Sequence, residues 1–177
     1  MNSYLIILII FTFIAVIALI FFSGYTKLKK YKEKMDKAEN LIDTNLEKKL
    51  ELIITLNSSI KKVTGKKDYL KEYIAIKDMI ITNIEKDLKL DEAVKLINDL
   101  IIDFNELNSN NDFLNIYKTL KSTDEILISA KNVFNQNAIL SNQLIKNFPN
   151  NLVAKITKFK IRSFYNLNNK TDDGEAF

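Results

Sequence analysis

The N-terminal stretch YLIILIIFTFIAVIALIFF, residues 4–22, is apolar except for Thr12, and no charged side chain occurs before Lys27. As a helix these residues would be about 28 Å long, close to the ~30 Å hydrocarbon core of a bilayer. The run ends in FFSGY, which lacks the small-residue cleavage site of a secretory signal peptide, and no positive side chain precedes it. We therefore expect an uncleaved transmembrane anchor over residues 1–24.

The remaining sequence predicts an all-α protein. The chain has only three glycines and one proline, too few for the many turns of a β or α/β fold. Apolar residues recur every three or four positions from Met35 to Val63, which indicates a first soluble helix over about 25–63. Gly65 is placed to end it, and Asp68 could cap the next helix.

Three further helices are expected. A second apolar stripe covers 68–88, and its phase slips near residues 89–91, where Asp91 could cap a third helix over 91–107. An asparagine-rich loop centred on 107–111 precedes a long helix over 112–148, which Pro149 closes. The short connections favour an antiparallel four-helix bundle with two long and two short helices over residues 25–167. If the two short helices instead formed one rod, the C-terminus would lie ~58 Å from the bilayer. We expect residues 168–177 to be a disordered tail.

The side-chain inventory excludes common catalytic chemistry. Histidine and cysteine are absent, so Ser-His or Cys-His nucleophilic machinery and Cys-ligated metal sites cannot form. A single arginine and a net charge of +4 do not favour nucleic-acid binding. Asp124 and Asp43 could bind a hard cation or share a proton if buried together, but solvated or capped carboxylates at the edge of a stripe are the simpler interpretation. We expect no catalytic residue, cofactor or metal.

Two features remain open. Asn137 and Ser141 lie four residues apart on the last long helix and either form a buried polar pair or face water. Residues 152–162 combine an apolar face with basic residues, so this segment is either an interfacial helix at the bilayer or a cap on the open end of the bundle.

Six lysines between positions 27 and 37 follow the anchor. We expect membrane-surface contact from Lys27, Lys29, Lys30, Lys32, Lys155 and Lys158.

The segment FPNNLVA at 148–154 contains Phe148, Pro149, Asn151, Leu152 and Ala154. It resembles the F-P-x-N-L-x-A motif of the LemA family. Further segments resemble other motifs of this family and follow the family's order along the chain. Thr123-Asp124 stands at its T-E position, and residues 42–49 (IDTNLEKK) resemble its I-D-x-x-L-x-R-R. The family's tryptophan before I-D and the prolines of its L-I-P-N-L and Y-P motifs have no counterpart here.

The resemblance implies a bacterial protein with one N-terminal transmembrane helix and a four-helical bundle. We expect a single-pass protein of the inner (cytoplasmic) membrane, with its bulk domain in the cytoplasm because lysines follow the anchor. The expected function is a membrane-anchored scaffold or adaptor without catalytic activity. The alternative is a lipid-organising or membrane-remodelling protein that acts through its basic segments. Expected partners are the lipid bilayer and an unknown membrane or cytoplasmic protein, with a homo-oligomer possible and no nucleic acid.

Overall fold

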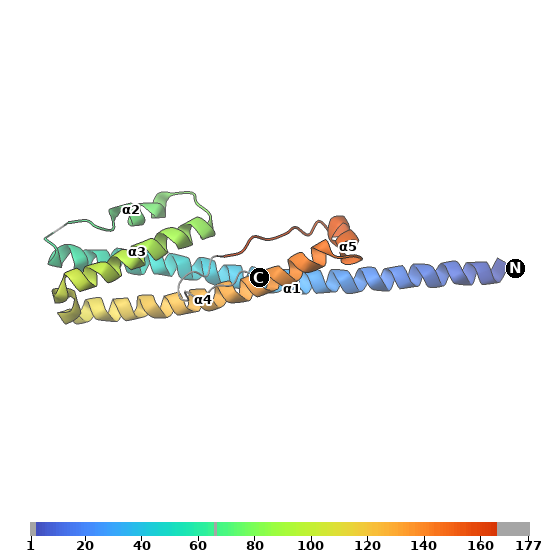
Figure 1. Ribbon diagram of the computed structural model, residues 1–177, viewed down its shortest axis with the longest axis horizontal. Helices are drawn as coiled ribbons and strands as arrows, with labels where there is room; N and C mark the ends of the chain where they lie inside the picture. The colour runs from blue at the N-terminus through green and yellow to red at the C-terminus, as the bar shows by residue number, and fades with distance from the viewer. Residues whose placement is uncertain (1–2, 66, 166–177) are drawn as a thin grey trace. The chain divides into compact units, whose positions relative to one another are not determined.

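The computed structural model describes residues 3–65 and 67–165, and every regular element in these ranges is helical (Figure 1). This confirms the all-α prediction. The predicted disordered tail, residues 168–177, lies outside the described residues. The elements in chain order are α1 (Ser3–Val63), α2 (Lys71–Ile74), the 3-10 helix η1 (Ala75–Asp78), α3 (Asn83–Asp103), the 3-10 helix η2 (Asn105–Ser109), α4 (Asn111–Lys146) and α5 (Asn150–Thr157).

The chain forms two compact units, which are described separately. Unit 1 comprises residues 1–37 and 133–164, and unit 2 comprises residues 38–132 and 165–177. Helices α1 and α4 contribute residues to both units.

Helix α1 begins with the apolar segment, residues 4–22, and continues through the first predicted stripe without a break. The apolar segment is long and apolar enough to cross a membrane, and it is not buried within the protein. The helix ends as the sequence predicts. Thr64 N–H donates to the Ile60 carbonyl at 2.8 Å, and Gly65 adopts a φ of 73°, the left-handed conformation that glycine tolerates best.

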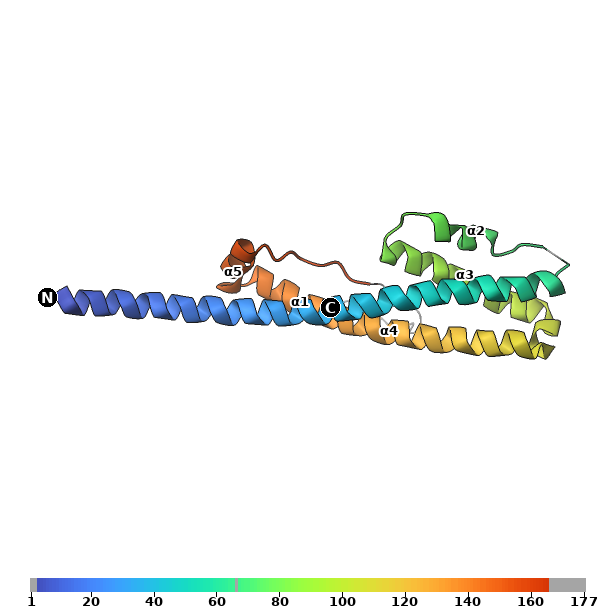
Figure 2. The same ribbon diagram turned by 180° about the vertical axis from the view of Figure 1, so that it is seen from behind.

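Unit 2 packs α3 alongside α1 and α4 (Figures 1 and 2). The predicted α1 stripe is buried along its length because its members recur on one helical face. The same holds for one face of α3 and one face of α4. The buried apolar residues are Ala38, Ile42, Leu46, Leu50, Ile53, Leu56 and Ile60 from α1, Leu90, Ala93, Val94, Ile97 and Leu100 from α3, and Phe113, Leu120, Leu127 and Ala130 from α4.

The two predicted short helices, 68–88 and 91–107, are wrong. The non-helical connection lies at residues 79–82, between η1 and α3. Helix α3 runs without interruption through residues 89–91, where the sequence predicted a break between two helices. Ile80, assigned to the second stripe, is fully exposed. The α3 stripe starts at a buried acid, Asp87, so its first position carried no apolar signal and the register appeared to slip at Leu90. The antiparallel four-helix arrangement itself stays a prediction.

Asp68 does not cap a helix. Its carboxylate accepts a hydrogen bond from Asn57 Nδ2 at 3.0 Å and pairs with Lys61, and the next helix begins only at Lys71. The hydrogen bond from Lys61 is the main reason that the pKa of Asp68 is lowered. The carboxylate therefore joins the last turns of α1 to the loop that follows.

In unit 1, α5 packs against α1 just beyond the apolar segment. Leu28, Val153 and Ala154 form a small buried core, and Phe21, Leu144, Ile145 and Phe159 pack around it. Helix α4 ends at Lys146, two residues before the predicted end, and Pro149 directly precedes α5.

Candidate functional site

A buried lysine lies at the centre of unit 2. Lys49, from α1, has a side chain that is only 1% exposed, although lysine is among the residues least often buried. Its Nζ donates to Asp91 Oδ1 of α3 at 2.6 Å and lies 2.6 Å from Asp124 Oδ1 of α4. One ammonium thus joins three helices through two carboxylates. We call Lys49, Asp91 and Asp124 the Lys49 cluster.

The Lys49 cluster holds its lysine in the charged form. Burial by itself lowers the pKa of Lys49, because a low-dielectric interior disfavours the ammonium. Attraction to Asp124 and Asp91, together with hydrogen bonds to both, outweighs this, so the pKa of Lys49 is raised above its ordinary value. The ammonium of Lys49 is therefore charged at neutral pH.

A second buried ion pair joins α3 and α4. Lys131 Nζ donates to both carboxylate oxygens of Asp87, at 2.8 and 2.7 Å, and the two side chains are 4% and 3% exposed. Burial raises the pKa of Asp87, and the Lys131 ammonium only partly opposes this effect. The pair is buried, and the Lys131 ammonium contacts both carboxylate oxygens, so removing one partner leaves an uncompensated buried charge.

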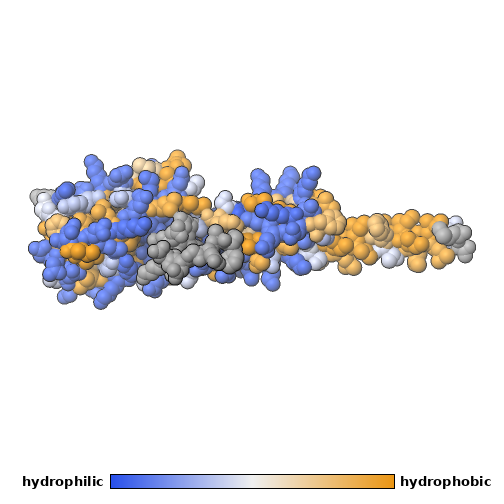
Figure 3. Space-filling view, viewed as in Figure 1, coloured by the Kyte–Doolittle hydropathy of each residue, from blue (hydrophilic) through white to orange (hydrophobic). Residues whose placement is uncertain are grey.

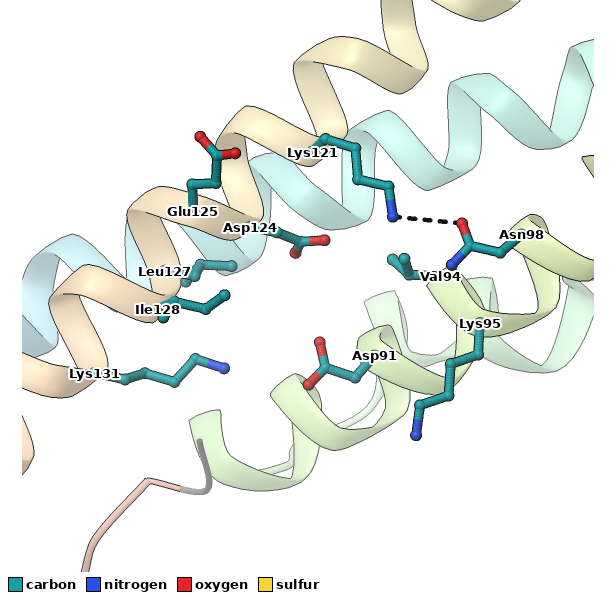
Figure 4. A pocket seen from close by; sticks show the side chains of 10 residues that line it. All are labelled: Asp91, Val94, Lys95, Asn98, Lys121, Asp124, Glu125, Leu127, Ile128 and Lys131. Atoms are coloured by element: carbon teal, nitrogen blue, oxygen red, sulfur yellow. Dashed lines mark hydrogen bonds between the residues drawn. The ribbon is translucent and has the colours of Figure 1, made fainter. Parts of the chain in front are cut away.

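A hollow of about 350 Å³ opens beside these pairs, between α3 and α4. Figure 4 shows Asp91 and Lys95 approaching it from α3 and Lys121, Asp124 and Lys131 from α4. Lys121 Nζ donates to Asn98 Oδ1 at 3.4 Å across its rim. The hollow is lined by both signs of charge. Among them, Asp91 and Asp124 pair with Lys49, and Lys131 pairs with Asp87.

The two acids singled out in the sequence do not form a pair. Asp124 is a partly buried member of the Lys49 cluster, with a side chain 19% exposed. The prediction of a solvated or capped carboxylate is therefore wrong for Asp124, which lies inside α4 and pairs with Lys49. Asp43 is exposed on α1, as expected. Among residues 3–65 and 67–165, no group of three or more carboxylates is placed to hold a metal ion.

The prediction that Asp91 caps a helix is wrong, because Asp91 lies inside α3 and pairs with Lys49. Sequence reasoning missed the other three residues Lys49, Asp87 and Lys131 of these ion pairs. Each occupies a stripe position, because Lys49 follows Leu46 by three residues, Asp87 precedes Leu90 by three and Lys131 follows Leu127 by four. Charged residues in the register of an apolar stripe were the available signal. Asn137 and Ser141 are both buried, 7% and 1% exposed. Of the two alternatives left open for them, burial therefore holds, and neither residue faces water.

The C-terminal motif lies against α1 in unit 1. Asn150 Oδ1 is 2.6 Å from the point where a Cβ on Gly24 would stand, and Val153 Cγ2 is 3.2 Å from it. A Cβ at residue 24 would therefore force Asn150 and Val153 to shift, whereas glycine permits this close approach of α5 to α1 without a shift. The rings of Tyr25 and Phe159 add an edge-on contact, with centroids 6.3 Å apart.

The motif residues have different environments. Ala154 is buried against α1, Pro149 is half-buried, and Asn151, Leu152 and Phe148 are exposed, Phe148 by 78%. Asn151 Oδ1 accepts from the N–H of Leu152 at 2.8 Å in the first turn of α5. Thus part of the motif fixes α5 on α1, and part of it faces outward.

All six lysines predicted to contact the membrane surface are exposed and belong to unit 1: Lys27, Lys29, Lys30, Lys32, Lys155 and Lys158. Lys32 pairs with Asp36 at 2.6 Å, and Lys29 lies 3.9 Å from Glu33. Lys32 and Lys158 also line a hollow of about 290 Å³ together with Lys160 and Arg162. The structure therefore brings one member of the first lysine group together with the basic C-terminal segment.

The C-terminal segment after α5 is fixed to α4. Asn142 donates to the Arg162 carbonyl at 2.9 Å and accepts from the Arg162 N–H at 3.0 Å. The Arg162 guanidinium lies 5.6 Å from the ring centre of Phe134. Lys158, at the end of α5, adopts a φ of 59°, which turns the chain out of the helix.

The comparisons with known proteins agree with the motifs. A family model described as LemA family matches residues 38–175, which is most of the chain. The match begins after the apolar segment and the six lysines that follow it. No curated protein matches the chain. Because the match extends over unit 2 and the C-terminal motif, the chain belongs to the LemA family.

Proposed function

We propose that this LemA-family protein is a membrane-anchored helical scaffold or adaptor without catalytic activity. The observation that carries the proposal is the composition of α1. Its first part is an exposed apolar segment, and its later part supplies the buried stripe and Lys49 to the core of unit 2. One helix thus joins a candidate membrane span to a packed domain. Exposed apolar surface of this extent needs a lipid or protein cover.

The ion pairs of unit 2 fit a structural role. The buried charges at Lys49, Asp87 and Lys131 are used to connect α1, α3 and α4. A buried ion pair of this kind can specify one arrangement of helices, at a cost in stability. A scaffold needs a fixed surface more than a reactive group.

The proposal places the protein in the bacterial inner membrane as a single-pass protein with its domain in the cytoplasm. Support comes from the exposed lysines directly after the apolar segment, since positive residues beside a span favour the cytoplasmic side.

Crosslinking in native membranes followed by purification of the full chain tests the adaptor function. We expect a defined protein partner, or a second copy of the chain, that is retained when residues 1–24 are exchanged for an unrelated transmembrane helix. Lys48→Met is the control for a change on the protein surface, because Lys48 is exposed, and this variant should retain the same partner. Turnover of a substrate that is lost in Asp124→Asn, with the fold intact, would contradict a non-catalytic role.

Lipid organisation is the second candidate, and the exposed lysines of unit 1 favour it specifically. The full chain is reconstituted in neutral and in anionic vesicles, and clustering of labelled anionic lipid is measured. Clustering that disappears at high salt and in a Lys27→Gln, Lys29→Gln, Lys30→Gln variant would support this function, because salt screens exposed charges. Equal lipid mixing at low salt would leave the adaptor function alone.

A further inference from the structure

Helix α5 exposes apolar side chains on the flank that does not contact α1. Leu152 and Ile156 are 53% and 68% exposed and lie four residues apart, on one side of the helix. Phe148, just before α5, is 78% exposed. We call these three residues the α5 flank. Large apolar residues grouped in this way mark an interaction surface more often than isolated ones do.

The other side of α5 is held firmly on α1. Val153 and Ala154 are both 2% exposed, and the contacts with α1 involve Phe21, Gly24 and Leu28. Because Gly24 admits Asn150 and Val153 so closely, α5 is fixed at the level where the apolar segment ends.

This level coincides with the expected surface of the bilayer. If the apolar segment fills the hydrocarbon core, residues 22–28 rise through about 9 Å beyond it. The headgroup layer on each side of the core is about 5–7 Å thick. Figure 3 shows hydrophobic side chains at α5 next to the hydrophobic surface of the apolar segment.

We propose that the α5 flank inserts into the headgroup and acyl-chain boundary of the same leaflet from which α1 emerges, so that α5 is a second, interfacial membrane contact. The partner is the lipid leaflet, because the flank continues the hydrophobic surface of a membrane-spanning segment. Lys155 and Lys158 are exposed on the same short segment and complement anionic headgroups, as in other interfacial helices. This inference rests on the proposed membrane anchor.

The absence of native cysteine allows the position of α5 to be measured with single labels. The full chain, carrying Ile156→Cys, is labelled with an environment-sensitive fluorophore and reconstituted in vesicles that contain lipids with a spin-label quencher, placed at a shallow depth for residues 151 and 156 and at a deep position for residue 10. Asn151→Cys is the matched control, because Asn151 is also exposed but lies about 140° away around the helix. Ile10→Cys, within the apolar segment, reports insertion of the anchor separately.

We expect a blue-shifted emission and strong lipid quenching at Ile156, with clearly weaker quenching at Asn151. Quenching at Ile10 without quenching at Ile156 would overturn the interfacial contact and leave the anchor intact. Protection of Ile156 from both lipid quencher and aqueous iodide would mean that protein covers the flank, which also overturns the inference. No quenching at Ile10 would refute the anchor, and with it the premise for α5.

Discussion

At the scale of single residues, Lys49 is the side chain on which unit 2 most depends. Lys49→Met keeps the length of the side chain but leaves Asp91 and Asp124 without their shared cation. Removing one member of a buried pair costs about 3–5 kcal/mol, and we expect the lower end because both carboxylates retain some solvent access. Urea unfolding of the full chain in detergent measures this loss. The exposed neighbour gives the control Lys48→Met, which should change stability by less than about 0.5 kcal/mol.

The same residue predicts an alkaline pH dependence. Since the pKa of Lys49 in the folded protein is raised above its ordinary value of 10.5, its stabilising contribution is complete below that value. The contribution is lost as the pH rises through the folded-state pKa. The stability difference between the wild-type protein and Lys49→Met should therefore be constant from neutral pH to about 10 and shrink above 10.5. A difference that shrinks already between pH 7 and pH 9 would show that Lys49 loses its proton too easily for this account.

Asp87 and Lys131 form a matched pair for a double-mutant cycle. Asp87→Leu and Lys131→Met alone should each destabilise unit 2 by about 3–5 kcal/mol, because each leaves one buried charge. The double variant should recover most of that loss, since two apolar side chains can fill the buried site. Additive losses, measured by urea unfolding, would contradict a direct pairing.

The pKa of Asp87 is raised. The contribution of Asp87 to stability is therefore greatest at acid pH and declines as the pH rises through the folded-state pKa of Asp87.

At the scale of elements, the start of α3 depends on a capping box. The Thr82 hydroxyl accepts from the N–H of Glu85 at 3.2 Å, and the Glu85 carboxylate accepts from the N–H of Thr82 at 2.9 Å. Thr82→Ala should destabilise the protein by about 1 kcal/mol, as the loss of an N-cap does. Thr55→Ala is the control, because the Thr55 hydroxyl bonds only to its own helix. Equal unfolding midpoints for the two variants would show that α3 does not need its cap.

The docking of α5 should depend on the size of residue 24. A leucine at Gly24 would overlap Asn150 and Val153, so Gly24→Leu should release α5 from α1. Gly24→Ala should be milder, because the nearest atom, Asn150 Oδ1, ends a side chain that can turn away and alanine favours helix. Trypsin cleavage at Lys155 and Lys158 measures release, and Ser23→Leu at the exposed neighbouring position is the control. Unchanged cleavage in Gly24→Leu would mean that α5 is not held through this contact.

The elements also show how far sequence patterns reach. The α1 stripe, the end of α1 at Val63 and both ends of α4 were predictable within two residues, because apolar spacing and Gly65 or Pro149 gave separate signals. The start of α3 was missed although Thr82 and Glu85 have the spacing of a capping box. Asp87 occupies a buried position on the same face of α3 as the apolar residues that follow. Because Asp87 is charged, apolar spacing did not identify it as the start of that face. The partners of Lys49 come from different helices, and spacing along one helix cannot reveal such pairs.

At the scale of the whole molecule, the position of the domain relative to the membrane is the most consequential prediction. Six lysines between residues 27 and 37 follow the apolar segment. Positive residues beside a span favour the cytoplasmic side, so we expect a cytoplasmic domain. Single cysteines at exposed positions, Glu51→Cys and Ser129→Cys, should react with a membrane-impermeant maleimide only after cells are permeabilised.

The design separates topology from folding. Ile53→Cys, at a fully buried position, should stay unreactive in permeabilised cells until the protein is unfolded, which shows that the labelled chain is folded. Labelling of Glu51→Cys and Ser129→Cys in intact spheroplasts, with Ile53→Cys still protected, would place the folded domain outside the cytoplasm. In that case the lysines after the apolar segment would not have set the orientation. The α5 flank would then lie against the outer leaflet, because Gly24 fixes α5 to the same end of the apolar segment in either orientation.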